Sequence, residues 1–363
     1  MTSIIIITSL IVFFILFINQ KNFGQMPSGK RQTAIHNSPN FRDKQFQNLS
    51  TTPSLAEGVS MSSVLIQFIF KKGKRNKPSG TIPSKKTDLH ALNPNEDVIV
   101  WFGHSSYFLQ VDGKKILVDP VFSGAASPIK ATTRSFKGSD IYTTDDIPEI
   151  DYLFISHDHW DHLDYETVLK LKSKIKTIIC GLGVAEHLEL WGFEPSIIIE
   201  KDWYQTINLA DGFVVNTTPA RHFSGRGLKR NQSLWMSFVL KTPSKNIFLG
   251  GDSGYDFHFK EIGDKFGPFD LAVMECGQYD NNWKYIHLLP EHMMPAAKEL
   301  QAKTVIPVHW GKFALANHDW DEPIIKISEY AKAENLPLIT PMIGEKVNLN
   351  EKYNGIEWWK NID

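Results

Sequence analysis

The stretch ISHDHWDH, residues 155–162, most strongly limits what this chain can fold into and do, because it contains three histidines and two aspartates in eight positions. An apolar run that reads as a β-strand precedes it, so the cluster falls at a strand end, where α/β folds place ligand-binding loops. His157 and His159 are two residues apart, and an extended backbone can turn both rings towards one metal ion. Asp161 and His162 are adjacent and diverge, which suits a second ion. The spacing therefore predicts a two-metal hydrolytic centre rather than a solvated polar loop.

Two metal ions need more ligands than one loop supplies, and other predicted strands offer them. Three candidates each follow an apolar β-rich run, as His157 does: His222, Asp252 and His309. A single histidine after a strand is more often structural than a ligand. The recurrence of this placement beside an HxHxDH cluster favours metal binding by all three.

From Asp97 onwards, short β-rich runs alternate with turn residues. The runs 107–111 and 115–118 are joined by Asp112-Gly113, a typical hairpin turn. Strands are expected at 98–102, 107–111, 115–118, 152–155, 177–180, 196–199, 213–217, 234–240, 247–249, 271–274 and 304–308. Helices are expected at 165–171, 185–191, 291–300 and 322–334. Many strands with interspersed helices predict sheets covered by helices.

The N-terminus is almost wholly apolar from Ile4 to Ile18. Fifteen residues fall short of the roughly 20 that span a bilayer core. No basic residue precedes Lys21, and no small-residue cleavage site follows, so we expect residues 1–20 to form an uncleaved membrane anchor. A removed signal segment, which would leave a periplasmic protein, and a buried helix are the alternatives. Positive charges after the segment favour the cytoplasmic face for the remaining chain.

Residues 21–95 are rich in polar residues and proline, and we expect an irregular extension that packs on or links to a hydrolase domain at 96–363. Within it, the apolar run 64–70 is followed by a basic stretch at 71–77. An apolar patch beside clustered positive charge suits an anionic membrane surface. A packed strand or helix followed by a solvated basic loop is the alternative.

The composition excludes several classes of function. The formal net charge is −1, so no overall field favours nucleic acid or another polyanionic partner. The only cysteines, Cys180 and Cys276, make neither a disulfide framework nor a cysteine-based zinc site. Cys180 follows an apolar run and is expected to be a small buried core residue.

The succession of HxHxDH, His, Asp and His at strand ends resembles the metallo-β-lactamase superfamily of dinuclear hydrolases. Over residues 97–344, the strings WFGHSSYFLQVDGKKILVDPVFS, ISHDHWDHLDY, GDSGYDFHFKEIG and HWGKFALANHDWDEP resemble more closely one branch of it. That branch comprises the N-acyl-phosphatidylethanolamine-hydrolysing phospholipases D and their bacterial relatives. The resemblance implies an α/β fold of the αββα sandwich type, with two mixed β-sheets flanked by helices.

The resemblance also implies how the ligands are shared between two Zn²⁺ ions. The first ion would take His157, His159 and His222, and the second Asp161, His162 and His309, with Asp252 as the bridge. His287 stands where the phospholipase has a substrate-contacting histidine, although Ile286 replaces a glutamine of that enzyme. His104 matches a family signature and is expected to be structural or to support a ligand. The remaining histidines match nothing in the pattern: His36, His90, His187, His258, His292 and His318.

Two zinc ions about 3.5–4 Å apart can share a hydroxide that attacks phosphorus in line, which is the expected chemistry. Asp252 would hold the metal spacing and Asp161 would orient the nucleophile, so these two carboxylates are the expected catalytic residues. The expected substrate is an N-acylphosphatidylethanolamine-like lipid diester at a membrane surface. One alternative is a lactonase or phosphoesterase for a small soluble metabolite. Another is a membrane-tethered zinc protein without catalytic activity, whose site would be closed and four-coordinate.

Overall fold

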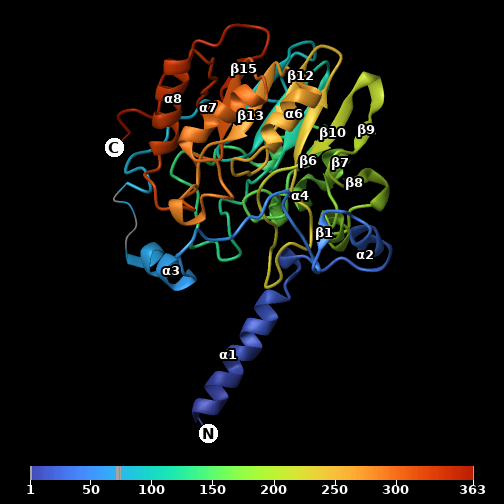
Figure 1. The fold of residues 1–363 in the computed structure, drawn as a ribbon, viewed down its shortest axis with the longest axis vertical. Helices are drawn as coiled ribbons and strands as arrows, with labels where there is room; N and C mark the ends of the chain where they lie inside the picture. Colours follow the sequence, from blue (N-terminus) through green and yellow to red (C-terminus); the bar gives the residue numbers. More distant parts are fainter. Residues whose placement is uncertain (1, 71–72, 74, 363) are drawn as a thin grey trace.

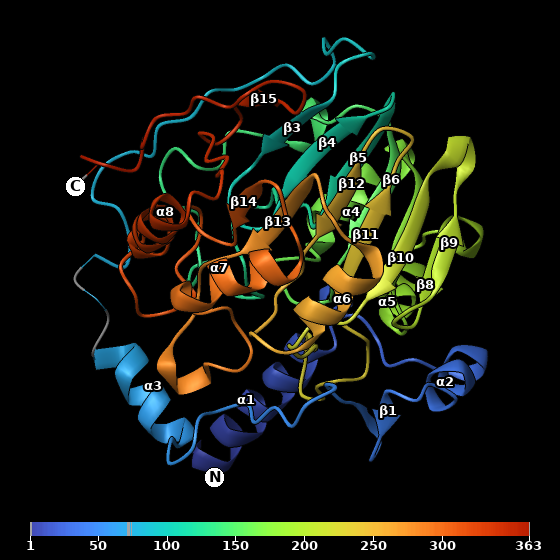
Figure 2. The same ribbon diagram turned by 45° about the horizontal axis from the view of Figure 1, so that its top comes forward.

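Two β-sheets form the centre of the molecule, and helices cover their outer faces (Figure 1; Figure 2). The computed structural model describes residues 2–70, 73 and 75–362. In spatial order the first sheet contains β15 (Lys346–Asn348), β3 (Val98–Trp101), β4 (Tyr107–Val111), β5 (Lys114–Val118), β6 (Ile150–Ile155), β7 (Ile175–Gly181) and β8 (Ile198–Lys201). The second contains β14 (Val305–Val308), β13 (Leu271–Glu275), β12 (Asn246–Leu249), β11 (Ser237–Lys241), β10 (Val214–Thr218) and β9 (Thr206–Asn208).

Both sheets are mixed. In the first, β15, β3, β4 and β5 pair antiparallel, whereas β5, β6, β7 and β8 pair parallel. In the second, β9 to β12 are antiparallel, and β12, β13 and β14 are parallel. Parallel neighbours bring their carboxyl ends to one edge, so loops from several strands meet there.

The helices divide between the two outer faces. The first sheet carries α4 (Tyr165–Leu171) and α5 (Val184–Leu190), and the second carries α6 (His258–Phe266), α7 (Pro290–Glu299) and α8 (Glu322–Glu334) (Figure 2). Strand β4 shows why the layers form. Tyr107, Leu109 and Val111 pack in the core between the sheets, while Phe108 packs on the helix side with Val168 of α4. Because alternate residues of a strand face opposite sides, a strand covered on both faces is mostly apolar, and in β4 the one polar residue is the buried Gln110. The expected αββα sandwich is confirmed.

Most predicted strands and helices coincide with observed ones, and α4 and α8 match their predicted bounds. The strand expected at 196–199 is displaced, because Pro195 begins a 3₁₀ turn at Pro195–Ile197 and β8 starts only at Ile198. The pattern did not reveal β9, β15 or α6. Cys180 is buried, as expected.

The N-terminal region contains several short elements. These are α1 (Thr2–Ile18), a 3₁₀ turn η1 (Lys21–Phe23), α2 (Gly29–His36), β1 (Phe41–Arg42), β2 (Gln45–Phe46) and α3 (Met61–Phe70). Helix α1 projects away from the sandwich (Figure 1). Residues 71, 72 and 74 of the basic stretch lie outside the described residues.

Within the described ranges, no helix combines the length and the apolar character needed to cross a membrane.

An arginine attaches this region to the first sheet. The guanidinium of Arg31 in α2 forms ion pairs with Glu186 and Glu189 of α5 and with Glu200 of β8. Burial alone would lower the pKa of Arg31, but the three carboxylates outweigh it and raise the pKa above its usual value. The extension is therefore held against the domain by a half-buried charge cluster.

Trp101 at the end of β3 is a large contributor to the core. Its ring centroid lies 5.3 Å from that of Trp310 and 6.4 Å from that of Trp358, and its indole N–H donates to the His104 carbonyl at 2.7 Å. We expect Trp101→Ala to lower the free energy of unfolding by about 3–5 kcal/mol, because it leaves a large cavity. Urea denaturation would measure this. Trp101→Phe should lose less stability. An alanine variant as stable as the parent would contradict a large contribution of Trp101 to the core.

Candidate metal centre

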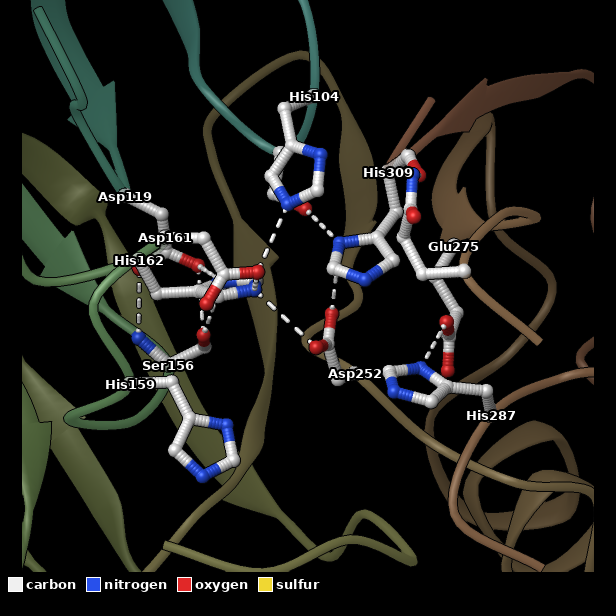
Figure 3. Close-up of polar contacts among 12 residues, drawn as sticks. His104, Asp119, Ser156, His159, Asp161, His162, Asp252, Glu275, His287 and His309 are labelled. Atoms are coloured by element: carbon white, nitrogen blue, oxygen red, sulfur yellow. Dashed lines mark hydrogen bonds and ion pairs between the residues drawn. The ribbon is translucent and has the colours of Figure 1, made fainter. Parts of the chain in front are cut away.

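The seven predicted metal ligands converge at the edge where loops leave strands of both sheets. Figure 3 labels His159, Asp161, His162, Asp252 and His309 of this set. The stretch His157–His162 follows β6 of the first sheet. From the second sheet, His222 follows β10, Asp252 follows β12 and His309 follows β14. Each ligand thus stands beyond the carboxyl end of a strand, as the sequence pattern indicated.

The first group of ligands is formed by histidines alone. Nε2 of His157 lies 2.9 Å from Nδ1 of His159, and Nε2 of His222 lies 3.2 Å from the same atom. Three imidazole nitrogens this close, on rings from two different loops, can converge on one metal ion.

The second group gathers around Asp252. Its Oδ2 lies 3.1 Å from Nε2 of His162, and its Oδ1 lies 3.2 Å from Nδ1 of His309. The same Oδ2 lies 3.7 Å from Nε2 of His222 in the first group. Nε2 of His162 also lies 3.5 Å from Oδ2 of Asp161. The Asp252 carboxylate therefore stands between the two groups, where a bridging ligand would be.

The donor set fits metal binding. Nitrogen from neutral imidazole and oxygen from carboxylate are ligands that zinc and other divalent transition metals accept. Among the described residues, Nε2 of His162 and Oδ1 of Asp252 are buried side-chain atoms that make no hydrogen bond of good geometry, although each lies 3.1 or 3.2 Å from a polar atom of a neighbouring ligand. Buried polar atoms rarely lack a hydrogen bond, so this arrangement agrees with a role of both atoms as metal ligands.

Two neighbours orient the ligands, as often happens around metal sites. Asp119 accepts hydrogen bonds from the backbone N–H and the hydroxyl of Ser156, at 2.8 and 2.5 Å. Its Oδ2 lies 2.9 Å from Nδ1 of His162, which leaves Nε2 for Asp252 or a metal (Figure 3). On the other side, Nε2 of His104 lies 2.8 Å from Oδ2 of Asp161. Sequence reasoning did not single out Asp119, although it directly follows a predicted strand.

His287 lies beside the ligand group and is fixed by an acidic partner. Its Nδ1 is 2.8 Å from Oε2 of Glu275, the last residue of β13 (Figure 3). The other oxygen of Glu275 accepts from the backbone N–H groups of Ser253, at 2.5 Å, and Leu288, at 3.3 Å. Sequence reasoning missed Glu275; its position at the end of a predicted strand was the available signal.

Burial and neighbouring charges set the protonation of the ligands. Burial holds the pKa values of His157, His222 and His309 well below their usual range, so these rings are neutral at pH 7 and can bind metal. Burial alone would raise the pKa of Asp161, but His162 and His104 lower it below its ordinary value. Burial, with the nearby Glu275, raises the pKa of Asp252 to about 6.

A cavity of about 360 Å³ opens onto the ligands. His159, His222, His287 and Arg230 are among its polar lining residues. Apolar side chains form much of the remainder: Leu55, Met61, Val64, Phe223, Trp283, Ile286 and Leu315. Because Leu55, Met61 and Val64 belong to the N-terminal extension, that region builds one wall of the candidate substrate pocket.

Comparisons with known proteins agree with this geometry. The family model described as beta-lactamase superfamily domain matches residues 114–310. An uncharacterised protein of Mycobacterium tuberculosis is 33% identical over 327 residues, covering 89% of this chain and 88% of that protein. N-acyl-phosphatidylethanolamine-hydrolyzing phospholipase D 1 of Caenorhabditis elegans is 28% identical over 296 residues, covering 73% of this chain and 82% of that enzyme. The solved structure of a metallo hydrolase from Ignicoccus hospitalis aligns with a TM-score of 0.53 at 22% identity, covering 70% of this chain and 98% of that one.

Proposed function

This chain belongs to the metallo-β-lactamase superfamily and is a metal-dependent hydrolase, and from that premise we propose that it is a two-zinc phosphodiesterase of the phospholipase D type. The observation that carries the proposal is the Asp252 carboxylate between two groups of ligands, with Oδ2 3.1 Å from His162 and 3.7 Å from His222. A site with two ions suits displacement at a phosphodiester, where attacking and leaving oxygens must be stabilised together.

The ligands would be shared as their two groups suggest. His157, His159 and His222 would hold one ion, and Asp161, His162 and His309 the other, with Asp252 fixing their separation. When bound, the ions would supply Lewis acidity and lower the pKa of water.

The chain's own residues then orient the reactants. His104 holds Oδ2 of Asp161, so Oδ1 of this ionised carboxylate is the atom that can accept a hydrogen bond from the attacking water. His287, fixed by Glu275, also lines the cavity.

The proposed substrate is an N-acylphosphatidylethanolamine-like lipid at a membrane surface. Three observations support it: the apolar wall of the cavity, the exposed apolar helices α1 and α3, and the similarity to a phospholipase D with that substrate in its name. We propose further that residues 1–20 anchor the chain to the membrane, with the hydrolase domain on the cytoplasmic side.

A second candidate is hydrolysis of a small soluble ester, lactone or phosphodiester. The cavity of about 360 Å³ favours it, because that volume lies at the small end of ligand pockets and holds a metabolite more completely than a diacyl lipid.

Metal removal combined with a substrate screen tests both proposals. We expect the full chain to contain zinc and to release an N-acylethanolamine and phosphatidic acid from lipid vesicles. A chelator should abolish this release and added Zn²⁺ should restore it, because the ions supply the Lewis acidity. Metal analysis before and after chelation would accompany the assay. Full activity without metal would exclude the mechanism, and faster turnover of soluble lactones or diesters would favour the second candidate.

A further inference from the structure

Asp158 stands between the ligands His157 and His159 and is buried, yet its carboxylate bonds elsewhere. Its Oδ1 accepts the backbone N–H of Gly225 at 2.7 Å. Its Oδ2 accepts the Ser233 hydroxyl at 2.8 Å and lies 3.2 Å from Nε2 of a histidine on α5. The middle residue of the metal-binding loop is therefore fixed by groups outside that loop.

The histidine on α5 is His187, which matched no motif in the sequence. Its Nδ1 accepts the backbone N–H of Gln25 at 3.1 Å. Because Nδ1 accepts this hydrogen bond, the ring proton stands on Nε2, which donates it to Asp158. A continuous chain of hydrogen bonds thus runs from the backbone of the N-terminal segment to the metal-binding loop.

Arg226 makes a second connection. Its Nη1 donates to the carbonyl of Asp158 at 2.8 Å and to that of Leu163 at 2.6 Å, and its Nε donates to the carbonyl of Asn22 at 3.0 Å. The guanidinium carbon lies 4.1 Å from the ring centroid of Trp160. Arg226 is buried, and it holds both ends of the loop that carries His159, Asp161 and His162.

Aromatic contacts form a third connection. The ring centroids of Phe17, at the end of α1, and Phe23 are 5.2 Å apart, and those of Phe23 and Trp160 are 5.0 Å apart. The indole N–H of Trp191 donates to the carbonyl of Lys21 at 2.7 Å, which fixes the same segment against α5. Trp160 stands between two ligands in the sequence, so these contacts reach the loop directly.

We propose that residues 17–25, the brace segment, hold the metal-binding loop in its ligating conformation, with His187 and Arg226 as positioning residues. The inference rests on the metal centre of the proposed function and is independent of the substrate. A loop fixed in advance keeps its ligands in place, whereas a loosened loop must be ordered when the metal binds. Loss of outer partners of metal ligands typically lowers metal affinity about 10–100-fold.

Gly24 offers a test that leaves the loop itself unchanged. A Cβ atom at this position would lie 2.0 Å from Nδ1 of His187, so Gly24→Ala must separate the brace segment from that ring. Using the full chain, we expect this variant to bind Zn²⁺ about 10–100-fold more weakly in competition with a chelator. In the metal-free protein, amide hydrogen exchange of His162 and Leu163, which bond to the His159 carbonyl, should accelerate.

The matched control is Gly29→Ala. Gly29 has a φ of +54° and Gly24 a φ of +73°, so alanine strains the backbone at both positions. At Gly29, however, no atom of the described chain lies within 4 Å of the added Cβ. This variant should keep the zinc affinity and the loop exchange rates of the parent.

His187→Leu removes both hydrogen bonds of the ring without adding a side chain to the brace segment, and it should reproduce the effect if Gly24→Ala does not fold. If folded Gly24→Ala or His187→Leu keeps the amide exchange rates of the loop and the zinc affinity of the parent, the brace segment does not position the metal-binding loop. If the parent itself binds no zinc, the two-zinc proposal fails, while the exchange measurement still decides the brace. The two failures are therefore distinguishable.

Discussion

Asp252→Ala is expected to lower kcat about 10³-fold or more and to reduce the metal content of the protein. The Asp252 carboxylate lies within 4 Å of ligands in both groups: it reaches His157, His162, His222 and His309. Losing a group that organises the charges around the transition state typically costs 10²–10³-fold, and here the metal ions would be lost as well. Steady-state kinetics combined with metal analysis of the purified chain would measure both effects.

The control for this variant is Asp264→Ala. Asp264 lies on α6 with an exposed side chain, and its ion pair with Lys260 is a surface pair worth little. The Asp264→Ala variant should keep the activity and metal content of the parent. Asp252→Asn separates charge from shape, because the amide retains the size of the carboxylate but loses its negative charge. Parental activity and metal content in Asp252→Ala would contradict the role of a bridging ligand.

The candidate site could be predicted from the sequence because its ligands follow strands. A run such as 152–155 identifies a strand end locally, and HxHxDH at that end specifies a metal loop without further context. His222, Asp252 and His309 were found by the same rule. The sandwich brings strand ends together at one edge, which is why a local rule located candidate ligands that are distant in the sequence but close in space.

Residues that act on the ligands were not predictable in this way. Asp119 and Glu275 follow predicted strands as the candidate ligands do, whereas His187 has no such signal. All three touch their partners only after the sheets and helices pack, so the local pattern does not show which residues they orient. The brace segment covers the end of the expected anchor, residues 1–20, and the start of a stretch that the composition describes only as an irregular extension. Its function depends on contacts with α5 and the loop after β10, which are far from it in sequence.

Parts of the fold were missed for similar reasons. Strands β9 and β15 have three residues each, too few to show alternation, and exist because longer strands offer them an edge. For residues 64–70 the sequence left strand and helix open, since a short apolar run suits both. The structure makes this segment part of α3, with Val64 buried and the side chains of Leu65 and Ile66 exposed.

The exposed face of α3 leads to the second prediction. The helix is tied to the domain by Gln67, which accepts a hydrogen bond from the Asn282 amide at 2.8 Å, while Leu65 and Ile66 are 59% and 54% exposed. Met61 and Val64 of the same helix line the cavity at the metal ligands. If α3 contacts a bilayer at that cavity, each exposed side chain adds about 1–1.5 kcal/mol, half of what full burial gives.

Ile66→Glu should therefore slow hydrolysis of N-acylphosphatidylethanolamine in vesicles about 10-fold, and the double variant L65E/I66E about 100-fold, since each 1.4 kcal/mol is a factor of ten. Hydrolysis of a soluble phosphodiester should be unchanged, because neither side chain lines the cavity. Ile356→Glu is the matched control: this isoleucine of the C-terminal segment is 65% exposed, and its replacement should affect neither substrate. If the double variant hydrolyses the vesicle lipid at the parental rate, α3 does not contact the lipid surface. An equal loss on both substrates would instead assign the effect to a distorted cavity wall.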